Sequence, residues 1–209
     1  MSYNGAKSSA KTRRQPKQAR AQAMVEVTLE ATQLLLVEIG YELTNTTRIA
    51  ERAGISVGSL YQYFSGRDEI IGELQRRHHK QTSDILEVAF AEAEGMPIEG
   101  AVRRLVQATA DLHRHEPELH RVLTEIVPSS VNQESRVAGN AKIGAAQKRW
   151  FRSMAAQIGL KDTAISSMVI REAVEGSIHN AAIHGDPEHL DAVVEELSVM
   201  IIAYLNSRR

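Results

Sequence analysis

Between Ser56 and Phe64 the chain places an amide, serine hydroxyls and two phenols within a few residues of one another. Helical spacing turns Gly58 and Gln62 away from the apolar side chains of the same segment. An amide can pair with adenine through two hydrogen bonds, a serine hydroxyl with several bases, and a phenol with a phosphate. A small polar helix face of this kind suits insertion into the DNA major groove, so we predict that this segment binds DNA.

Two short helices separated by a glycine must position this face. Residues 44–53 and 56–64 each read as a short helix, with Thr44 and Ser56 as the expected N-cap residues. Gly54 lies at the turn, where a positive φ costs glycine nothing. The pattern predicts a helix-turn-helix. Its expected internal contact is made by Ile49, Ala50, Ala53, Ile55, Leu60, Tyr63 and Phe64.

The basic charge of the chain is concentrated at its N-terminus. The net charge is −1. Residues 1–20 nevertheless contain six basic residues and no acidic one, and the rest of the chain contains 19 basic and 26 acidic residues. Residues 1–16 show no apolar period, which predicts a disordered basic arm that contacts DNA phosphates or the minor groove. The alternative is a solvated leader without a binding role.

The stretch from Leu43 to Ile71, LTNTTRIAERAGISVGSLYQYFSGRDEII, resembles the DNA-binding signature of the tetracycline-repressor (TetR) family. The resemblance covers about residues 20–72. It departs from the family pattern at Thr46, Arg48 and Ser65. The matching residues are Thr44, Ile49–Ala50, Ala53–Gly54–Ile55–Ser56, Gly58–Ser59–Leu60–Tyr61, Tyr63–Phe64 and Arg67–Asp68–Glu69.

The resemblance implies a dimeric repressor that leaves a palindromic operator when a small-molecule effector fills its C-terminal domain. Arg48 adds a charge for a phosphate, and Arg67 opens a helix whose free N–H groups could meet another phosphate. The expected DNA-binding residues are Lys17, Thr44, Arg48, Ser56, Val57, Gly58, Ser59, Tyr61, Gln62, Tyr63 and Arg67.

The hydrophobic period is helical throughout, which predicts an all-α fold of about nine helices. We expect an arm at 1–16, a helix-turn-helix domain at 17–66 and a ligand-binding and dimerisation domain at 67–209. The expected helices span 17–40, 44–53, 56–64, 67–93, 98–115, 116–127, 131–158, 162–184 and 187–206.

Middle helices of the C-terminal domain carry the candidate ligand contacts. Each apolar candidate could instead be plain core, and the Arg171–Glu175–His179 ladder could be a solvated salt-bridge face. The candidates are Leu105, Thr109, Leu112, Val122, Ile126, Trp150, Phe151, Met154, Met168, Arg171, Glu175 and His179.

The last two helices are the expected dimer interface. The helix before the last carries small residues that permit close approach, so two copies could form a four-helix bundle. The alternative is that the apolar stripe of the last helix faces the core of its own chain. That stripe consists of Leu190, Val193, Val194, Leu197, Met200, Ile201 and Tyr204.

Metal and catalytic chemistry are not expected from the sequence. There is no cysteine among 209 residues, and the eight histidines lack a helical metal-ligand spacing. His113 and His115 point in different directions on a helix, the segment from His115 to His120 contains Pro117, and His78 diverges from the residue after it. We therefore expect surface or interface histidines, no metal, no cofactor and no enzyme activity.

Two further interpretations remain open. The same fold without an effector would be an architectural DNA-binding protein, and an enzyme that reuses the fold is a third possibility. No run of 18 apolar residues exists, and the basic N-terminus is not followed by an apolar segment. These features favour a soluble cytoplasmic protein.

Overall fold

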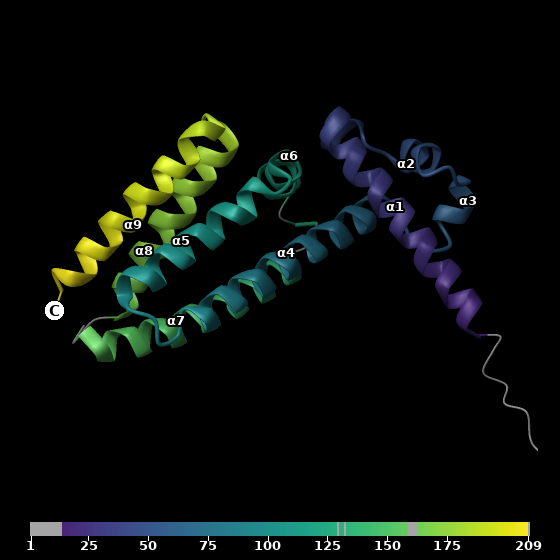
Figure 1. The fold of residues 1–209 in the computed structure, drawn as a ribbon. Coiled ribbons are helices and arrows are strands. Elements are labelled where there is room, and N and C mark those ends of the chain that lie inside the picture. Colours follow the sequence, from purple (N-terminus) through teal and green to yellow (C-terminus); the bar gives the residue numbers. More distant parts are fainter. Residues whose placement is uncertain (1–13, 129, 132, 159–162, 209) are drawn as a thin grey trace, which may run out of the picture. The chain divides into compact units, whose positions relative to one another are not determined.

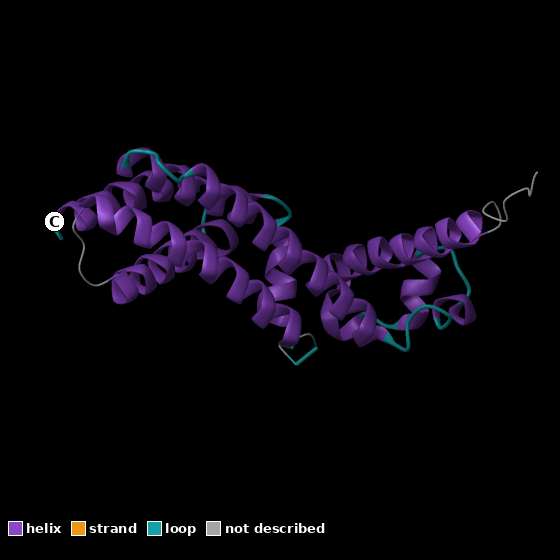
Figure 2. Ribbon diagram, turned by 90° about the horizontal axis from the view of Figure 1, so that it is seen from below, coloured by secondary structure: helices purple, strands orange, loops and turns teal. Residues whose placement is uncertain are grey.

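The computed structural model describes residues 14–128, 130–131, 133–158 and 163–208. Every regular element in these ranges is a helix, which confirms the all-α prediction (Figure 2). The chain divides into two compact units, residues 1–71 (unit 1) and 72–209 (unit 2). None of the described helices is long and apolar enough to cross a membrane.

Unit 1 is built from α1 (Arg14–Leu43), α2 (Thr46–Arg52), α3 (Val57–Leu60) and the first residues of α4 (Arg67–Glu92). α1 kinks at Gly40, whose φ of 78° lies in the left-handed region, and a short helical piece follows the predicted end. The residues that hold these helices together are fully or almost fully buried. They are Thr28, Leu29, Ala31, Thr32, Leu35, Leu36, Tyr41, Thr44, Ile49, Ala50, Leu60, Phe64, Ile70 and Ile71.

Unit 2 contains the rest of α4 together with α5 (Ile98–Arg114), α6 (Pro117–Arg121), α7 (Gln133–Ile158), α8 (Thr163–His179) and α9 (Leu190–Asn206). α9 runs along α5 and α8 (Figure 1). α7 lies beside α4, where Lys142 forms ion pairs with Asp84 at 2.6 Å and Glu87 at 2.8 Å.

Two of the predicted helices of unit 2 change form near their C-terminal ends. The helix expected at 116–127 is α6 followed by a π-helical turn, η1 (Val122–Ile126). The helix expected at 162–184 is α8 followed by a second π-helical turn, η2 (Asn180–His184). A short 3-10 helix, η3 (Pro187–His189), then precedes α9. π-helical turns are rare and occur often at functional sites.

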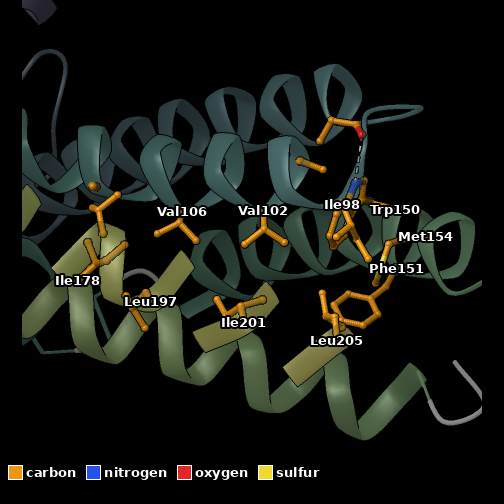
Figure 3. Packing of buried hydrophobic residues seen from close by; sticks show 14 of the residues in the cluster. Ile98, Val102, Val106, Trp150, Phe151, Met154, Ile178, Leu197, Ile201 and Leu205 are labelled. Carbon is orange, nitrogen blue, oxygen red and sulfur yellow. Dashed lines mark hydrogen bonds between the residues drawn. The ribbon is translucent and has the colours of Figure 1, made fainter. Parts of the chain in front are cut away.

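The core of unit 2 lies between α5, α7 and α9 (Figure 3). Val102 and Val106 of α5 face Leu197 and Ile201 of α9. At one end of this core, the indole Nε1 of Trp150 donates a hydrogen bond to the carbonyl oxygen of Ala93 at 3.3 Å. A buried indole needs such a partner, so this bond fixes α7 against the end of α4.

The apolar stripe of α9 serves mainly the core of its own chain. Four of its seven members are buried, Val193 and Tyr204 are half-buried, and Met200 is exposed. The expectation that the whole stripe forms a dimer interface is therefore wrong, because α9 packs against α5 through it. The four buried members are Leu190, Val194, Leu197 and Ile201.

Candidate nucleic-acid interface and ligand cavity

The first helix of the helix-turn-helix is capped by Asn45 and not by Thr44. The Asn45 side-chain oxygen accepts a hydrogen bond from the backbone N–H of Arg48 at 3.0 Å. Thr44 is fully buried, and its hydroxyl donates to the carbonyl oxygen of Gly40 at 2.7 Å. This placement contradicts both expectations for Thr44, because its side chain lies inside unit 1 and cannot reach a phosphate.

The second helix begins as the sequence predicts. Ser56 caps α3 by accepting a hydrogen bond from the N–H of Ser59 at 3.0 Å. Gly54 in the turn has a φ of 67°, which confirms the predicted positive value. Regular α-helix ends at Leu60, but the N–H of Phe64 still donates to the Leu60 carbonyl oxygen at 3.1 Å. The helix is therefore shorter than predicted, and hydrogen-bonded turns form the rest of the segment from Tyr61 to Phe64.

The outer face of the second helix is small and polar. Leu60 and Phe64 are buried, whereas Gly58 and Gln62 are exposed. Tyr61 is 52% exposed, and its hydroxyl lies 3.3 Å from the Thr46 hydroxyl of α2. The structure therefore gathers an amide and two hydroxyls on one surface of unit 1. The other predicted DNA contacts of this segment are exposed Ser56 and half-buried Val57, Ser59 and Tyr63.

Arg67 does not extend into solvent. Its Nε donates to Asp68 at 2.9 Å, its Nη1 to the carbonyl oxygens of Tyr41 and Thr44 at 3.4 Å, and its Nη2 to the Tyr41 hydroxyl at 2.9 Å. All three guanidinium nitrogens thus donate within unit 1. In the structure this guanidinium holds the start of α4 against the end of α1. Its contact with a phosphate stays a prediction.

The basic residues predicted to contact phosphate are only partly described. Arg48 is exposed, and its Nη1 donates to the carbonyl oxygen of Leu43 at 2.8 Å, close to the first turn of α2. The side chain of Lys17 and residues 1–13 of the arm lie outside the described residues. Arg48 and the arm therefore stay predictions.

Unit 2 contains a cavity of about 800 Å³ between α4, α5, α7 and α8. This volume is in the range of small-molecule sites, which span about 300–1,000 Å³. Its wall is mainly apolar, with Phe90, Val106 and Phe151 among the lining residues. The buried side chain of Gln75 donates to the Leu123 carbonyl oxygen at 3.0 Å, but its Oε1 has no hydrogen-bond partner among the described residues. A buried acceptor of this kind favours a ligand with an N–H or O–H group.

Most of the predicted ligand contacts line this cavity. Leu112 is half-buried outside it, Ile126 is 41% exposed, Val122 packs in the protein interior, and Met154 belongs to the core. Those four expectations are not supported, because the side chains lie away from the cavity wall. The predicted residues that do line it are Leu105, Thr109, Trp150, Phe151, Met168, Arg171, Glu175 and His179.

α4 and the polar side of α7 also contribute to the cavity wall, and neither contribution was predicted from the sequence. Gln75, His78 and Phe90 line the cavity from α4, and Asn140 and Gln147 line it from α7. Gln147 is buried and donates to the carbonyl oxygen of Ser167 at 3.0 Å. A glutamine on the apolar side of an amphipathic helix was the available signal for both Gln75 and Gln147.

The histidines are not confined to the surface, which corrects the sequence-based expectation. His113 is 3% exposed and His120 is 7% exposed, and both lie within one cluster with His78 and His179. Burial, with smaller effects of neighbouring imidazoles, lowers the pKa of His78 to about 4 and that of His120 to about 3. Both rings are consequently neutral near pH 7. Spacing along one helix could not reveal this cluster, since it is assembled from α4, α5, α6 and α8.

A helix-turn-helix with a polar outer face, in one chain with a helical unit that contains a ligand-sized cavity, defines the class of DNA-binding transcriptional regulators. Residues 29–74 match the family model described as bacterial regulatory proteins, tetR family. Residues 97–205, more than half of the chain, match the model described as tetracyclin repressor-like, C-terminal domain. The chain belongs to the TetR family of transcriptional regulators.

Solved structures share this fold at low sequence identity. The fatty acid degradation regulator FadR from Bacillus halodurans has a TM-score of 0.63 and 18% identity, over 85% of this chain and 94% of that one. The TetR-family regulator PfmR from Thermus thermophilus has a TM-score of 0.63 and 22% identity, over 84% and 93%. A TetR-family protein from Mesorhizobium loti has a TM-score of 0.64 and 20% identity, over 87% and 98%. No curated protein sequence is significantly similar to this chain.

Proposed function

We propose that this regulator is a homodimeric repressor that binds a palindromic operator and leaves it when a small-molecule effector fills the cavity of unit 2. The observation that carries this proposal is that one helix, α4, belongs to both units. Its first turn is held in unit 1 by Arg67, and its later turns supply Gln75, His78 and Phe90 to the cavity wall. As a regulator acting on bacterial DNA, the protein would work in the cytoplasm.

Effector release follows from this shared helix by population shift. Suppose that α4 can take two positions and that an effector binds one of them more tightly. The effector then shifts the population toward that position by an amount set by the difference between the two binding free energies. The hydrogen bond between Arg67 and Tyr41 couples α4 to α1, so a displacement of α4 would move the helix-turn-helix as well. A molecule with equal affinity for both positions would fill the cavity without changing DNA affinity.

The proposed DNA contacts are those that the fold leaves on the surface of unit 1. Gln62 and Ser59 would read base edges, Tyr61 and Arg48 would contact phosphates, and the arm at 1–16 would add sequence-independent attraction. Two such helices in successive major grooves require a spacing of about 34–36 Å, and therefore a dimer. The remaining proposed contacts are Lys17, Ser56, Val57, Gly58 and Tyr63.

Exposed faces of α8 and α9 are the proposed dimer interface in place of the buried stripe. Each face repeats at helical spacing and is mostly small or apolar, so two copies can approach closely. We expect Val199→Asp to shift the chain toward monomer in light scattering, and Val88→Asp, an exposed valine on α4, to leave the mass unchanged. The faces consist of Ile165, Val169, Glu172 and Gly176 on α8 and Ala192, Glu196, Val199 and Ala203 on α9.

The effector proposal is tested by adding small molecules to the operator complex and following fluorescence anisotropy. Linear fatty acids belong in the panel, because the Bacillus halodurans relative is described as a regulator of fatty acid degradation. Leu105→Trp, which places a larger side chain in the cavity, should weaken the response to an active compound. Leu112→Trp, seven residues further along α5, should retain it. If no compound shifts either the anisotropy or the melting temperature, the effector proposal is wrong and an architectural role is favoured.

A further inference from the structure

Three histidines from three helices meet at the edge of the cavity in unit 2. His113 of α5, His120 of α6 and His179 of α8 have ring centres 4.5 Å, 5.4 Å and 5.5 Å apart, pair by pair. One ring nitrogen from each lies within 4.8 Å of the other two. Two imidazole nitrogens bound to one ion at about 2.0–2.1 Å each are separated by somewhat more than 3 Å. Small side-chain rotations would bring the three nitrogens onto one ion.

His113 presents an unpaired nitrogen to this cluster. Its Nδ1 lies 2.9 Å from the carbonyl oxygen of Thr109, which can only accept a hydrogen bond, so Nδ1 carries the proton. In the neutral ring the buried Nε2 then bears a lone pair, and it has no hydrogen-bond partner among the described residues. The Glu175 Oε1 lies 3.8 Å away and is an electron-pair donor as well. A cation bound between this nitrogen and this oxygen would satisfy both.

Partners around the cluster orient the other two rings. The Glu125 carboxylate oxygen Oε1 lies 2.8 Å from Nε2 of His179 and 2.8 Å from Nε2 of His184. The Nε2 of His78 lies 3.0 Å from Nδ1 of His120. A metal-binding histidine commonly uses its second nitrogen for such a bond, which fixes the ring.

The local backbone supports a site at this position. His120 precedes the π-helical turn η1 by two residues, and His179 directly precedes η2. Glu125 and His184 lie within these two turns. Both π-helical turns of unit 2 therefore bring side chains to the same cluster. This agrees with the frequent occurrence of such turns at functional sites.

We propose that His113, His120 and His179 bind one divalent transition-metal ion, with Glu175 within reach as a fourth ligand. Three imidazoles without a thiolate suit Zn²⁺, Co²⁺, Ni²⁺ or Cu²⁺ and disfavour Mg²⁺ and Ca²⁺, which prefer oxygen ligands. His120, His179 and Glu175 also line the cavity, so a further coordination position would open toward it. An effector with a carboxylate or another metal-binding group could occupy this position. That part of the inference rests on the proposed function.

The test is calorimetric titration of the metal-free full-length protein with ZnCl₂, and visible absorption with CoCl₂. We expect one ion per chain and a Co²⁺ spectrum with nitrogen ligation. His120→Gln and His179→Gln should weaken binding by more than about 100-fold, beyond the loss typical of an outer partner. His115→Gln, an exposed histidine near the end of α5, is the matched control and should bind as the parent does.

Two results would overturn the proposal. One is the absence of Zn²⁺ and Co²⁺ binding by the folded parent protein, a result that does not depend on whether any variant folds. The other is loss of binding in His184→Gln with retention in His113→Gln, which would place the ion on Glu125, His179 and His184. Because the titration contains no DNA and no effector, its failure leaves the repressor proposal untouched, and failure of operator binding leaves this site untouched.

Discussion

The Nη2 of Arg67 lies 2.9 Å from the phenolic oxygen of Tyr41, and its guanidinium carbon lies 4.3 Å from the centre of the same ring. The same guanidinium donates to two carbonyl oxygens at the end of α1. A residue expected to bind phosphate thus serves to join α4 to the rest of unit 1. We expect the loss of this side chain to destabilise unit 1.

Replacing Arg67 by alanine should destabilise the protein by about 2 kcal/mol. The change removes hydrogen bonds from a charged donor and a cation–π contact, each of which contributes on the order of 1 kcal/mol. Urea unfolding followed by circular dichroism measures the effect. Arg52→Ala is the control: it removes a solvent-exposed ion pair with Glu38, which water and salt screen, and should destabilise the protein clearly less than Arg67→Ala does. Equal effects of the two changes would contradict the proposal that Arg67 holds α4 against the end of α1.

Asn45→Ala should cost about 1 kcal/mol of unfolding free energy, because the side chain caps α2. Thr47→Ala, an exposed change in the first turn of the same helix, should be close to neutral. The comparison uses the same urea titration. If Thr47→Ala proves the more destabilising of the two, the assigned cap is wrong.

Gln62→Ala should reduce discrimination between bases at one position of each operator half-site by about 1–3 kcal/mol. Affinity for unrelated DNA should change little, because the side chain is expected to contact bases and not phosphates. Competition binding against single-base operator variants provides the measurement. Gln81→Ala, an exposed glutamine in unit 2, is the control. A uniform loss over all sequences would assign Gln62 to the backbone instead.

Deletion of residues 2–16 removes four basic side chains and should weaken binding to every DNA sequence alike. Each lost phosphate contact reduces the steepness of log K against log salt by about 0.9, so the slope should become shallower by up to about 3–4 for each chain, or about 7 for a bound dimer. Anisotropy titrations at several salt concentrations determine this slope. An unchanged slope would mean that the arm does not contact DNA.

Zn²⁺ at a free concentration of about 100 times its dissociation constant should stabilise the protein by about 2.7 kcal/mol, reduced by any binding to the unfolded chain. Thermal unfolding with and without the ion should therefore show a higher midpoint for the parent protein and for His115→Gln. His120→Gln should show no such increase. A rise of the same size in His120→Gln would mean that the stabilising ion binds elsewhere.

The helix-turn-helix could be predicted from sequence because its determinants are local. Gly54 and Ser56 act within a few residues of themselves, and both behave as expected. The cap of α2 was misplaced by one residue, since Thr44 and Asn45 are both good capping residues and only the packed structure shows that the Thr44 hydroxyl is used inside.

The site in unit 2 depends on tertiary contacts and was only partly predictable. The apolar character of Leu105 and Trp150 is the same for a core residue and for a cavity wall. Trp150 belongs to the core cluster and also lines the cavity, whereas Met154 belongs to the same cluster and does not line the cavity. The sequence was tested only for pairs that share one helix or segment, among them His113 with His115 and His115 with His120, and these pairs were rejected. In the structure the rings of His113 and His120 instead meet each other and that of His179, which lies on α8. Because the three rings come from three helices, the periodicity of a single helix cannot predict that they lie together.

Selection of bound duplexes from a random DNA pool at near-physiological salt tests whether the protein is a sequence-specific dimeric regulator. We expect a palindromic consensus with half-site centres about 10 base pairs or a multiple of that apart, and loss of the consensus at one position per half-site in Gln62→Ala. A folded protein that recovers no consensus would contradict sequence-specific repression and favour an architectural DNA-binding role.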